Sequence, residues 1–259
     1  ERRDQVLEAK PNQAHLSLDE FESQFNVTII TQNIDDLHER AGSSHVLHLH
    51  GEIDFARSSV DETLIYPLNG AEIKLGDRCQ KGSQLRPHIV WFGEAVPMID
   101  SAIEIVRKAD LIIIGPGSLF TSIVASLLIP GINEAISKSS ALKIYVSNLA
   151  MQPGETTSFS LDDHIQIIHD YMKPASLDLV LANNYIPNNL DPATANLLIK
   201  PSSENKGTVP IVFEPLLNTD DPLYHDPRKL AQITMESIYQ SRRDAKNHVP
   251  QYNQPEISQ

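Results

Sequence analysis

An apolar segment that leads directly into a dense group of polar side chains constrains this chain more than any other feature. Residues 27–30 read Val-Thr-Ile-Ile, a short apolar run typical of a buried strand. Residues 31–42 then read Thr-Gln-Asn-Ile-Asp-Asp-Leu-His-Glu-Arg-Ala-Gly, and residues 48–52 read His-Leu-His-Gly-Glu. Because α/β proteins bind ligands at the carboxyl ends of their strands, this order predicts a ligand site directly after the strand.

Apolar strands alternate with helical segments along most of the chain. Further strands are expected at 46–49, 86–94, 110–114, 143–146 and 177–182, and helices at 2–10, 16–25, 35–40, 101–108, from 121, at 132–137, 161–171 and 227–244. This alternation predicts an α/β, Rossmann-like fold with a mostly parallel sheet. The polar segment 54–85 predicts a small irregular lobe or β-insert, residues 183–226 are expected to be rich in loops, and the polar tail 245–259 is expected to be disordered.

Charge and composition restrict the partners of the chain. The formal net charge of −13 argues against a broad nucleic-acid or anionic-membrane surface, because phosphates would be repelled. The sequence holds neither a signal peptide nor an apolar run of the roughly 18 residues that a membrane span needs. The single cysteine, Cys79, excludes an intramolecular disulfide and a cysteine-rich zinc site. We therefore expect a cytoplasmic protein without a metal and without a nucleic-acid or membrane partner.

The first part of the chain, roughly residues 2–108, resembles the sirtuins, which are NAD-dependent protein deacylases. The resemblance rests on four strings: Lys10-Pro11-Asn12 with His15, residues 31–42, His50-Gly51-Glu52, and residues 86–94. The two cysteine pairs of zinc-bearing sirtuins are missing, and residues 81–87 are similar to the same segment of a zinc-less bacterial branch of the family. The family's opening glycine-rich βα unit is missing too, which predicts an incomplete NAD site and an impaired deacylase.

The resemblance implies roles for four of the polar residues after the strand. Gln32, Asn33 and Asp35 would hold the nicotinamide-ribose side of NAD. His50 would be the general base that activates a ribose hydroxyl, a role for which imidazole is suited because it titrates near neutrality. Without the full string, Asn33 and Asp35 would be interpreted as helix-cap and turn residues, and His50 as an ordinary histidine at a strand end.

The resemblance also implies a substrate site. Val90, Trp91 and Phe92 would line a tunnel for the acyl-lysine side chain of a peptide or protein substrate. The extended substrate would add to the protein as a strand.

The second part of the chain, roughly residues 108–240, resembles the family of 2-phospho-L-lactate transferases and gluconeogenesis factors. The strings that carry this resemblance are residues 115–122, 127–132 and 152–156, Asp163-His164 and residues 226–231. Glycines after a strand let the backbone approach a phosphate, while hydroxyl groups and N–H groups supply donors. The phosphate-binding residues would be Gly115, Gly117, Ser118, Thr121, Ser122, Gln152, Gly154 and Thr156. Asn148 would reach a ribose hydroxyl, and the ligand would be a nucleotide or a UDP-sugar.

The two resemblances meet at residues 105–115, where both families have a helix, Ala-Asp, an apolar strand and a glycine-containing turn. This predicts a hybrid of residues 1–108 and 109–244, each part lacking its first βα unit, with a tail at 245–259 and conceivably one continuous sheet. Gly115, Ser118 and Asn148 would then complete the NAD site. The leading functional hypothesis is an impaired NAD-dependent protein-lysine deacylase. A UDP-sugar-binding regulator and a non-functional hybrid are the alternatives.

Overall fold

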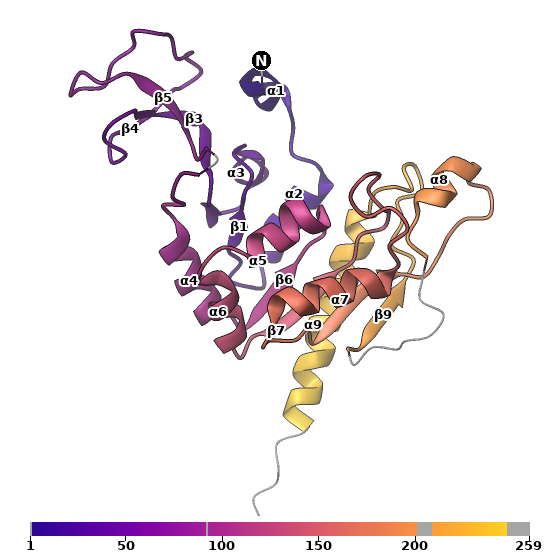
Figure 1. Cartoon of the computed structure of the whole chain (residues 1–259). Coiled ribbons are helices and arrows are strands. Elements are labelled where there is room, and N and C mark those ends of the chain that lie inside the picture. The colour runs from indigo at the N-terminus through magenta and orange to yellow at the C-terminus, as the bar shows by residue number, and fades with distance from the viewer. Residues whose placement is uncertain (1, 92, 201–208, 248–259) are drawn as a thin grey trace, which may run out of the picture.

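The strands of the described residues form three separate sheets. The structure, a computed structural model, describes residues 2–91, 93–200 and 209–247. The strands are β1 (Ile29–Thr31), β2 (Val46–His48), β3 (Gly51–Ser58), β4 (Ile65–Pro67), β5 (Leu85–Ile89), β6 (Leu111–Ile114), β7 (Leu142–Val146), β8 (Leu179–Asn183) and β9 (Ile211–Glu214). Within the described residues the sheet orders are β1-β2, β4-β3-β5 and β6-β7-β8-β9 (Figure 1).

Helices join these strands and cover the larger sheet. They are α1 (Arg2–Glu8), α2 (Gln13–Phe21), α3 (Leu37–Ala41), α4 (Ile99–Lys108), the π-helical turn η1 (Leu119–Val124), α5 (Ala125–Leu127), α6 (Ile132–Lys138), α7 (Leu161–Met172), α8 (Pro192–Leu197) and α9 (Pro227–Asn247). Among the described residues no single helix is long and apolar enough to cross a membrane. One bent pair, residues 119–127 with residues 132–138, passes the same length and composition test together, across a bend of 69°.

The four-stranded sheet is the centre of a three-layer α/β/α arrangement. All its strands run parallel. Successive side chains of a strand point to opposite faces, so Tyr145 packs in the same core as Ile168 of α7, while Ile144 packs against Ile238 of α9. Both strand residues are fully buried. Burial on both faces explains the continuous apolar runs of these strands in the sequence.

A shorter parallel pair carries the polar string at its end. β1 pairs with β2 in a register that sets Thr31 opposite His48. The polar residues that follow the two strands therefore emerge side by side.

A small antiparallel lobe follows β2 and projects from the rest of the molecule (Figure 1). Gly51 opens β3 with φ +78°, and a Cβ at this position would lie 2.1 Å from the carbonyl oxygen of His88 in β5. Only glycine combines this backbone conformation with so close an approach of the two strands. Gly51 therefore fixes how the lobe leaves the preceding turn.

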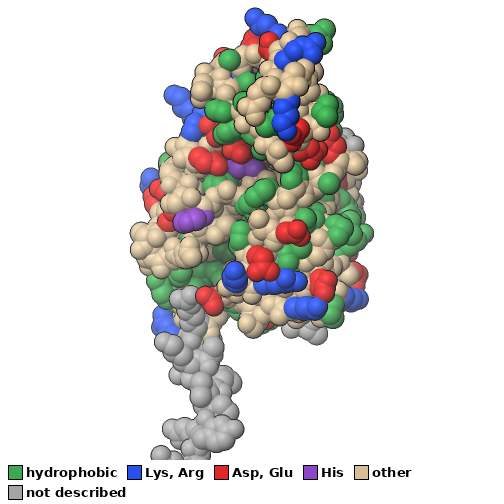
Figure 2. Space-filling model, turned by 90° about the vertical axis from the view of Figure 1, so that its left-hand side faces the viewer, with side chains coloured by type: hydrophobic (Ala, Val, Ile, Leu, Met, Phe, Trp, Pro, Cys, Tyr) green, Lys and Arg blue, Asp and Glu red, His purple; other side chains and the backbone are tan. Residues whose placement is uncertain are grey.

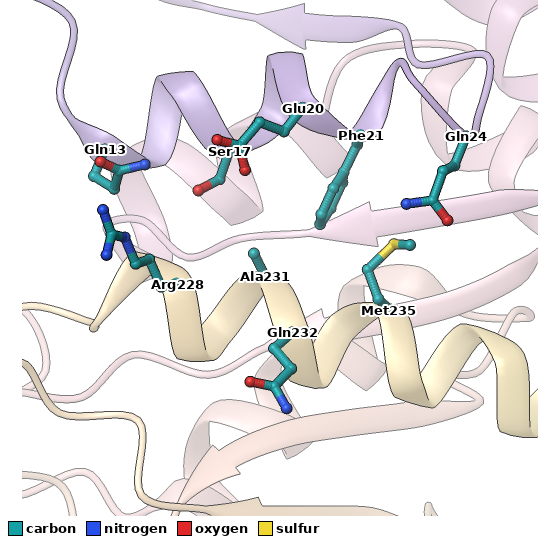
Figure 3. Close-up of a pocket in the computed structure, with 9 residues that line it drawn as sticks. All are labelled: Gln13, Ser17, Glu20, Phe21, Gln24, Arg228, Ala231, Gln232 and Met235. Atoms are coloured by element: carbon teal, nitrogen blue, oxygen red, sulfur yellow. The ribbon is translucent and has the colours of Figure 1, made fainter.

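The two parts of the chain pack against each other. α2 lies along α9 (Figure 3), and after α2 the side chain of Gln24 accepts the hydroxyl of Tyr239 in α9 at Oε1, over 2.7 Å. Phe25 packs on the core that contains Ile238 of α9. A contact across the predicted junction thus joins the first helices to the last one.

The predicted α/β fold is confirmed, and three details differ. The parallel strands are divided between two sheets, so the conceivable single sheet is not formed by the described residues. Residues 54–85 form most of the small antiparallel sheet, in agreement with the β-insert expected there, whereas the region expected to be rich in loops contains α8 and β9. Helix α9 continues to Asn247, so residues 245–247 of the expected tail are helical. Residues 248–259 lie outside the described part.

Candidate functional site

The carboxyl ends of β1 and β2 bring the predicted cofactor residues and the predicted base to one place. Leu49 donates its N–H to the carbonyl of Thr31 at 2.8 Å, which continues the parallel pairing past β2. The Nδ1 atom of His48 then donates to the carbonyl of Asn33 at 2.7 Å. Asn33 and His50, seventeen positions apart in the sequence (50 − 33), therefore follow two neighbouring strand ends.

His50 is joined directly to the predicted substrate segment. Its carbonyl accepts the N–H of Val90 at 2.8 Å, and Gly51 pairs with Ile89 at the start of the β3–β5 ladder. The side chain of His50 is half-buried, and within the described residues its imidazole makes no hydrogen bond. An imidazole that is partly exposed and has no partner of its own is free to contact a ligand.

The segment that follows Val90 is held by ionic contacts. Glu94 accepts the Trp91 N–H at 2.9 Å, Arg86 Nη2 at 2.6 Å and Arg57 Nη2 at 2.7 Å. The Trp91 N–H and the Arg86 guanidinium lower the pKa of the Glu94 carboxyl. Arg86 also lies 4.4 Å above the ring of Trp91, which is half-exposed. This network fixes the backbone of the predicted tunnel segment, whereas Phe92 lies outside the described residues.

The other predicted cofactor residues have structural partners. The Gln32 amide donates to the carbonyl of Ser122 at 3.2 Å and to the hydroxyl of Ser126. Asp35 accepts the N–H of Leu37 at 3.2 Å, as expected of a residue at the start of α3. Gln32 thus joins the end of β1 to η1 and α5, and it places the predicted sites of the two parts beside each other.

The glycine-containing turn after β6 is closely packed. Gly115 has φ +79°, and a Cβ there would lie 2.9 Å from the carbonyl oxygen of Val146 in β7. The Asn148 amide accepts from Gly117 N at 3.2 Å and donates to Gly117 O at 2.8 Å. The predicted ribose contact, Asn148, therefore holds the turn in shape.

A carboxylate of the chain itself occupies the donors of this turn. Glu155 Oε1 accepts from Ser118 Oγ at 2.5 Å, from Phe120 N at 2.9 Å and from Thr121 N at 3.2 Å. Burial raises the pKa of Glu155, but these three hydrogen bonds outweigh it, and the pKa lies below its usual value. The donors of the turn thus hold a negative charge, and in this structure the charge belongs to Glu155.

The loop at 152–156 is held by its own side chains. Thr156 is fully buried, and its hydroxyl accepts the N–H of Gln152 at 2.8 Å. The N–H of Gly154 donates to Thr157 Oγ1 at 3.1 Å. Together these bonds position Glu155 at the turn.

Two grooves among the described residues lie apart from His50. The larger groove, of about 380 Å³, runs between α2 and α9. Figure 3 shows Phe21 and Met235 extending into it from the two helices, with Gln13 and Arg228 at one end. None of the predicted site residues lines this groove. A smaller pocket at the carboxyl ends of β7 and β8 includes Asn148 beside Lys200.

A group of three possible metal ligands lies beside His50. Glu39, His48 and Glu52 each offer one atom, and these atoms all lie within 4.8 Å of one another. Burial lowers the pKa of His48, but its contacts with Asn33 and Glu39 outweigh this and raise it, while burial raises the pKa of Glu52.

Comparison with known proteins identifies the family. A model of the family described as 2-phospho-L-lactate transferase CofD matches residues 34–208, which is more than half of the chain. The chain belongs to the 2-phospho-L-lactate transferase CofD family. The matched span begins inside the string that resembles the sirtuins.

This CofD-family chain is also similar to deacylases. It is 52% identical over 132 residues to an NAD-dependent protein deacylase of Bacteroides thetaiotaomicron, covering 49% of this chain and 56% of that protein. It is 36% identical over 153 residues to a protein of Aquifex aeolicus named as a gluconeogenesis factor, covering 54% of this chain and 44% of that protein. A solved Sir2 homologue in complex with ADP-ribose has a TM-score of 0.49 at 31% identity, covering 66% of this chain and 69% of that one.

The chain spans about half the length of the curated relatives it matches. Both resemblances that the sequence predicts are confirmed, and a hybrid of the two families is consistent with them.

Sequence reasoning missed several contacts of this CofD-family chain. The roles of Glu155 at the turn and of Arg57 with Glu94 beside the tunnel segment have no local signal, because the partners are 34 to 37 positions apart. The expectation of no metal rests on the single cysteine, and it does not extend to the group of Glu39, His48 and Glu52.

Proposed function

We propose that the chain is an NAD-dependent protein-lysine deacylase of the sirtuin type, with His50 as general base. The observation that carries the proposal is the hydrogen bond between the His50 carbonyl and the Val90 N–H. It sets the predicted base beside the predicted acyl-lysine segment at the carboxyl ends of β1 and β2. The 52% identity to a protein named NAD-dependent protein deacylase supports the same reading.

The residues present fit the nicotinamide-ribose side of NAD. The imidazole of His50 makes no hydrogen bond within the described residues, and the side chain of Asn33 is exposed at the neighbouring strand end. NAD would supply the ribose that accepts the acyl group, with nicotinamide as leaving group. Asn33 would orient the ribose, and an imidazole nitrogen of His50 would accept a proton from a ribose hydroxyl. Val90 and Trp91 would hold the extended acyl-lysine substrate through the strand edge.

The test is NAD-dependent removal of an acetyl group from an acetyl-lysine peptide, with nicotinamide release measured in parallel. We expect slow turnover that His50→Ala lowers at least about 100-fold, the range of general-base contributions. The matched control is His45→Ala, because His45 is an exposed histidine five positions away. The proposal fails if the two variants have equal activity, or if the chain has no NAD-dependent activity.

A second candidate function rests on the Glu155 contacts. Ser118 Oγ and two backbone N–H groups hold a carboxylate at the turn after β6, and a phosphate group uses the same donors. Membership of the CofD family supports a nucleotide or UDP-sugar at this turn. The ligand's phosphate would have to displace Glu155. Gly115 and Gly117 would let it approach, with Gln152, Gly154 and Thr156 holding the facing loop.

Thermal melts with excess NAD or UDP-N-acetylglucosamine separate the two candidates. A ligand at about one hundred times its dissociation constant adds roughly 2.7 kcal/mol of stability. A shift with NAD alone supports the deacylase, and a shift with the UDP-sugar alone supports the regulator. If NAD also uses the turn after β6, Ser118→Ala should weaken NAD binding. An unchanged NAD affinity in this variant refutes a turn shared by the two sites.

Glu155 offers a sharper test of the second candidate. Glu155→Gln keeps the shape of the side chain but removes the charge that competes with a phosphate. UDP-sugar affinity should therefore rise in the variant, and an unchanged or lower affinity contradicts the assignment. Glu134→Gln, an exposed acid on α6, is the control for general charge effects. We propose a cytoplasmic location for either function.

A further inference from the structure

The three side chains beside His50 come from three different elements. Glu39 lies on α3, His48 ends β2 and Glu52 lies on β3. Their ligand atoms all lie within 4.8 Å of one another. Figure 2 shows histidine and acidic side chains close together on one face, below the projecting lobe. Residues brought together by three separate elements are held by the tertiary fold and are not a run of charges in the sequence.

The orientation of His48 is fixed by a backbone contact. Its side chain is only 6% exposed, and Nδ1 lies 2.7 Å from the carbonyl oxygen of Asn33. Because a carbonyl can only accept, Nδ1 carries the hydrogen, and in the neutral ring Nε2 carries a lone pair. Metal-binding histidines are oriented in the same way, with the second ring nitrogen donating to a carbonyl or carboxylate.

The lone pair of His48 Nε2 faces other electron-pair donors. Nε2 lies 2.9 Å from Glu39 Oε1, and a carboxylate oxygen of Glu52 completes the group. The carboxylates of Asp36 and Asp54 add negative charge around Glu52. Three converging donors with surplus negative charge around them favour a cation at this place, either a proton shared within the group or a metal ion.

We propose that Glu39, His48 and Glu52 bind a divalent transition-metal ion, with Zn²⁺ as the first candidate. One imidazole nitrogen and two carboxylate oxygens form a ligand set that suits Zn²⁺. Bonds of about 2.1 Å in a tetrahedral arrangement separate the ligand atoms by roughly 3.4 Å. The present separations, from 2.9 Å to at most 4.8 Å, bracket this value, so side-chain rotations that move the ligand atoms by up to about 1.4 Å would reach it.

The proposed ion has one open coordination position. Three protein ligands leave a fourth position of a tetrahedral ion free, as in catalytic rather than closed structural zinc sites. Glu39 is exposed at the surface, so a water molecule reaches this position. None of its three ligands contacts NAD or the peptide in the proposed deacylase, and His48 is linked to that site only through its hydrogen bond to the Asn33 carbonyl.

The test is Zn²⁺ binding to the chelator-treated full chain by isothermal titration calorimetry, with Co²⁺ absorption reporting the ligands. We expect one equivalent of metal to bind. His48→Gln and Glu39→Gln should each weaken Zn²⁺ binding at least about tenfold and change the visible Co²⁺ spectrum. Glu39→Gln matters most if His48→Gln fails to fold, because Glu39 is exposed and its replacement keeps the side-chain shape.

Matched controls identify the ligands. His38→Gln and His45→Gln change histidines nearby that do not belong to the group, and both should bind Zn²⁺ as the unaltered chain does. Loss of binding in His38→Gln instead of His48→Gln would assign the metal to the neighbouring pair of His15 and His38, whose rings lie 4.7 Å apart, and would overturn the proposal. Absence of stoichiometric binding would overturn it too, leaving an ion pair between His48 and Glu39.

Discussion

Replacing Gly51 with alanine tests how the small lobe and His50 are held together. Gly51 and Gly70 both have positive φ, +78° and +86°, but they differ in their surroundings. A Cβ at position 51 would lie 2.1 Å from the His88 carbonyl oxygen, whereas a Cβ at position 70 would meet nothing within 4 Å. Gly70→Ala is therefore a matched control that carries the backbone strain without the collision.

The expected difference follows from these distances. An alanine at a left-handed position costs roughly 1–2 kcal/mol in either variant. An ordinary carbon–oxygen contact needs about 3.3 Å, so in Gly51→Ala the two strands must separate by about 1.2 Å. Overpacking of this kind costs roughly 1–3 kcal/mol. At about 2–4 °C per kcal/mol for a chain of this size, Gly51→Ala should melt roughly 2–12 °C below Gly70→Ala.

The assay is a thermal melt of the two variants and the unaltered chain, followed by circular dichroism at neutral pH. Equal melting temperatures for the two variants would refute the reasoning, because the collision with His88 would then cost nothing. The deacylation assay gives a second readout. Gly51 lies next to His50, so Gly51→Ala should lower activity much more than Gly70→Ala does.

Three further changes test other parts of the structure. Burial lowers the pKa of His225 to about 4 from 6.5, so the unfolded chain binds a proton that the folded chain does not between these values. Stability should therefore fall by at most about 3 kcal/mol as the pH drops from about 6.5 to 4, and His225→Gln should remove this part of the pH dependence in denaturant titrations. Leu119 is fully buried, so Leu119→Ala should lower the free energy of unfolding in urea by about 2–5 kcal/mol. The side chain of Leu75 is 98% exposed, so Leu75→Ala should change it by less than about 0.5 kcal/mol. Similar losses in the two variants would contradict the core assignment. Arg57 is 2% exposed and forms an ion pair with Glu94, so Arg57→Met should lower the free energy of unfolding by about 2 kcal/mol. The variant should also raise KM for the peptide more than it lowers kcat. An unchanged KM would show that Arg57 does not position the tunnel segment.

The sequence alone indicated every strand of the two parallel sheets except β9, together with the turn residues of the predicted sites. The apolar run before Thr31 predicts β1, and the polar string after it lies at the end of that strand. The glycine pattern after β6 predicts a turn that presents donors to a negative charge, and the structure shows these donors holding Glu155. These features depend on residues that are neighbours in the sequence, so short-range periodicity and turn chemistry are enough to predict them.

Only the tertiary structure decided which groups meet. It divides the parallel strands between two sheets, directs the Gln32 amide across the junction to Ser126, and places Glu155 at the turn where an external anion was predicted. It also brings Glu39 to His48 across a turn and a strand. Strand β9 was missed because its four residues carry too little pattern to be separated from the loops around it. These outcomes depend on packing between segments that are distant in the sequence, and local patterns do not encode such pairings.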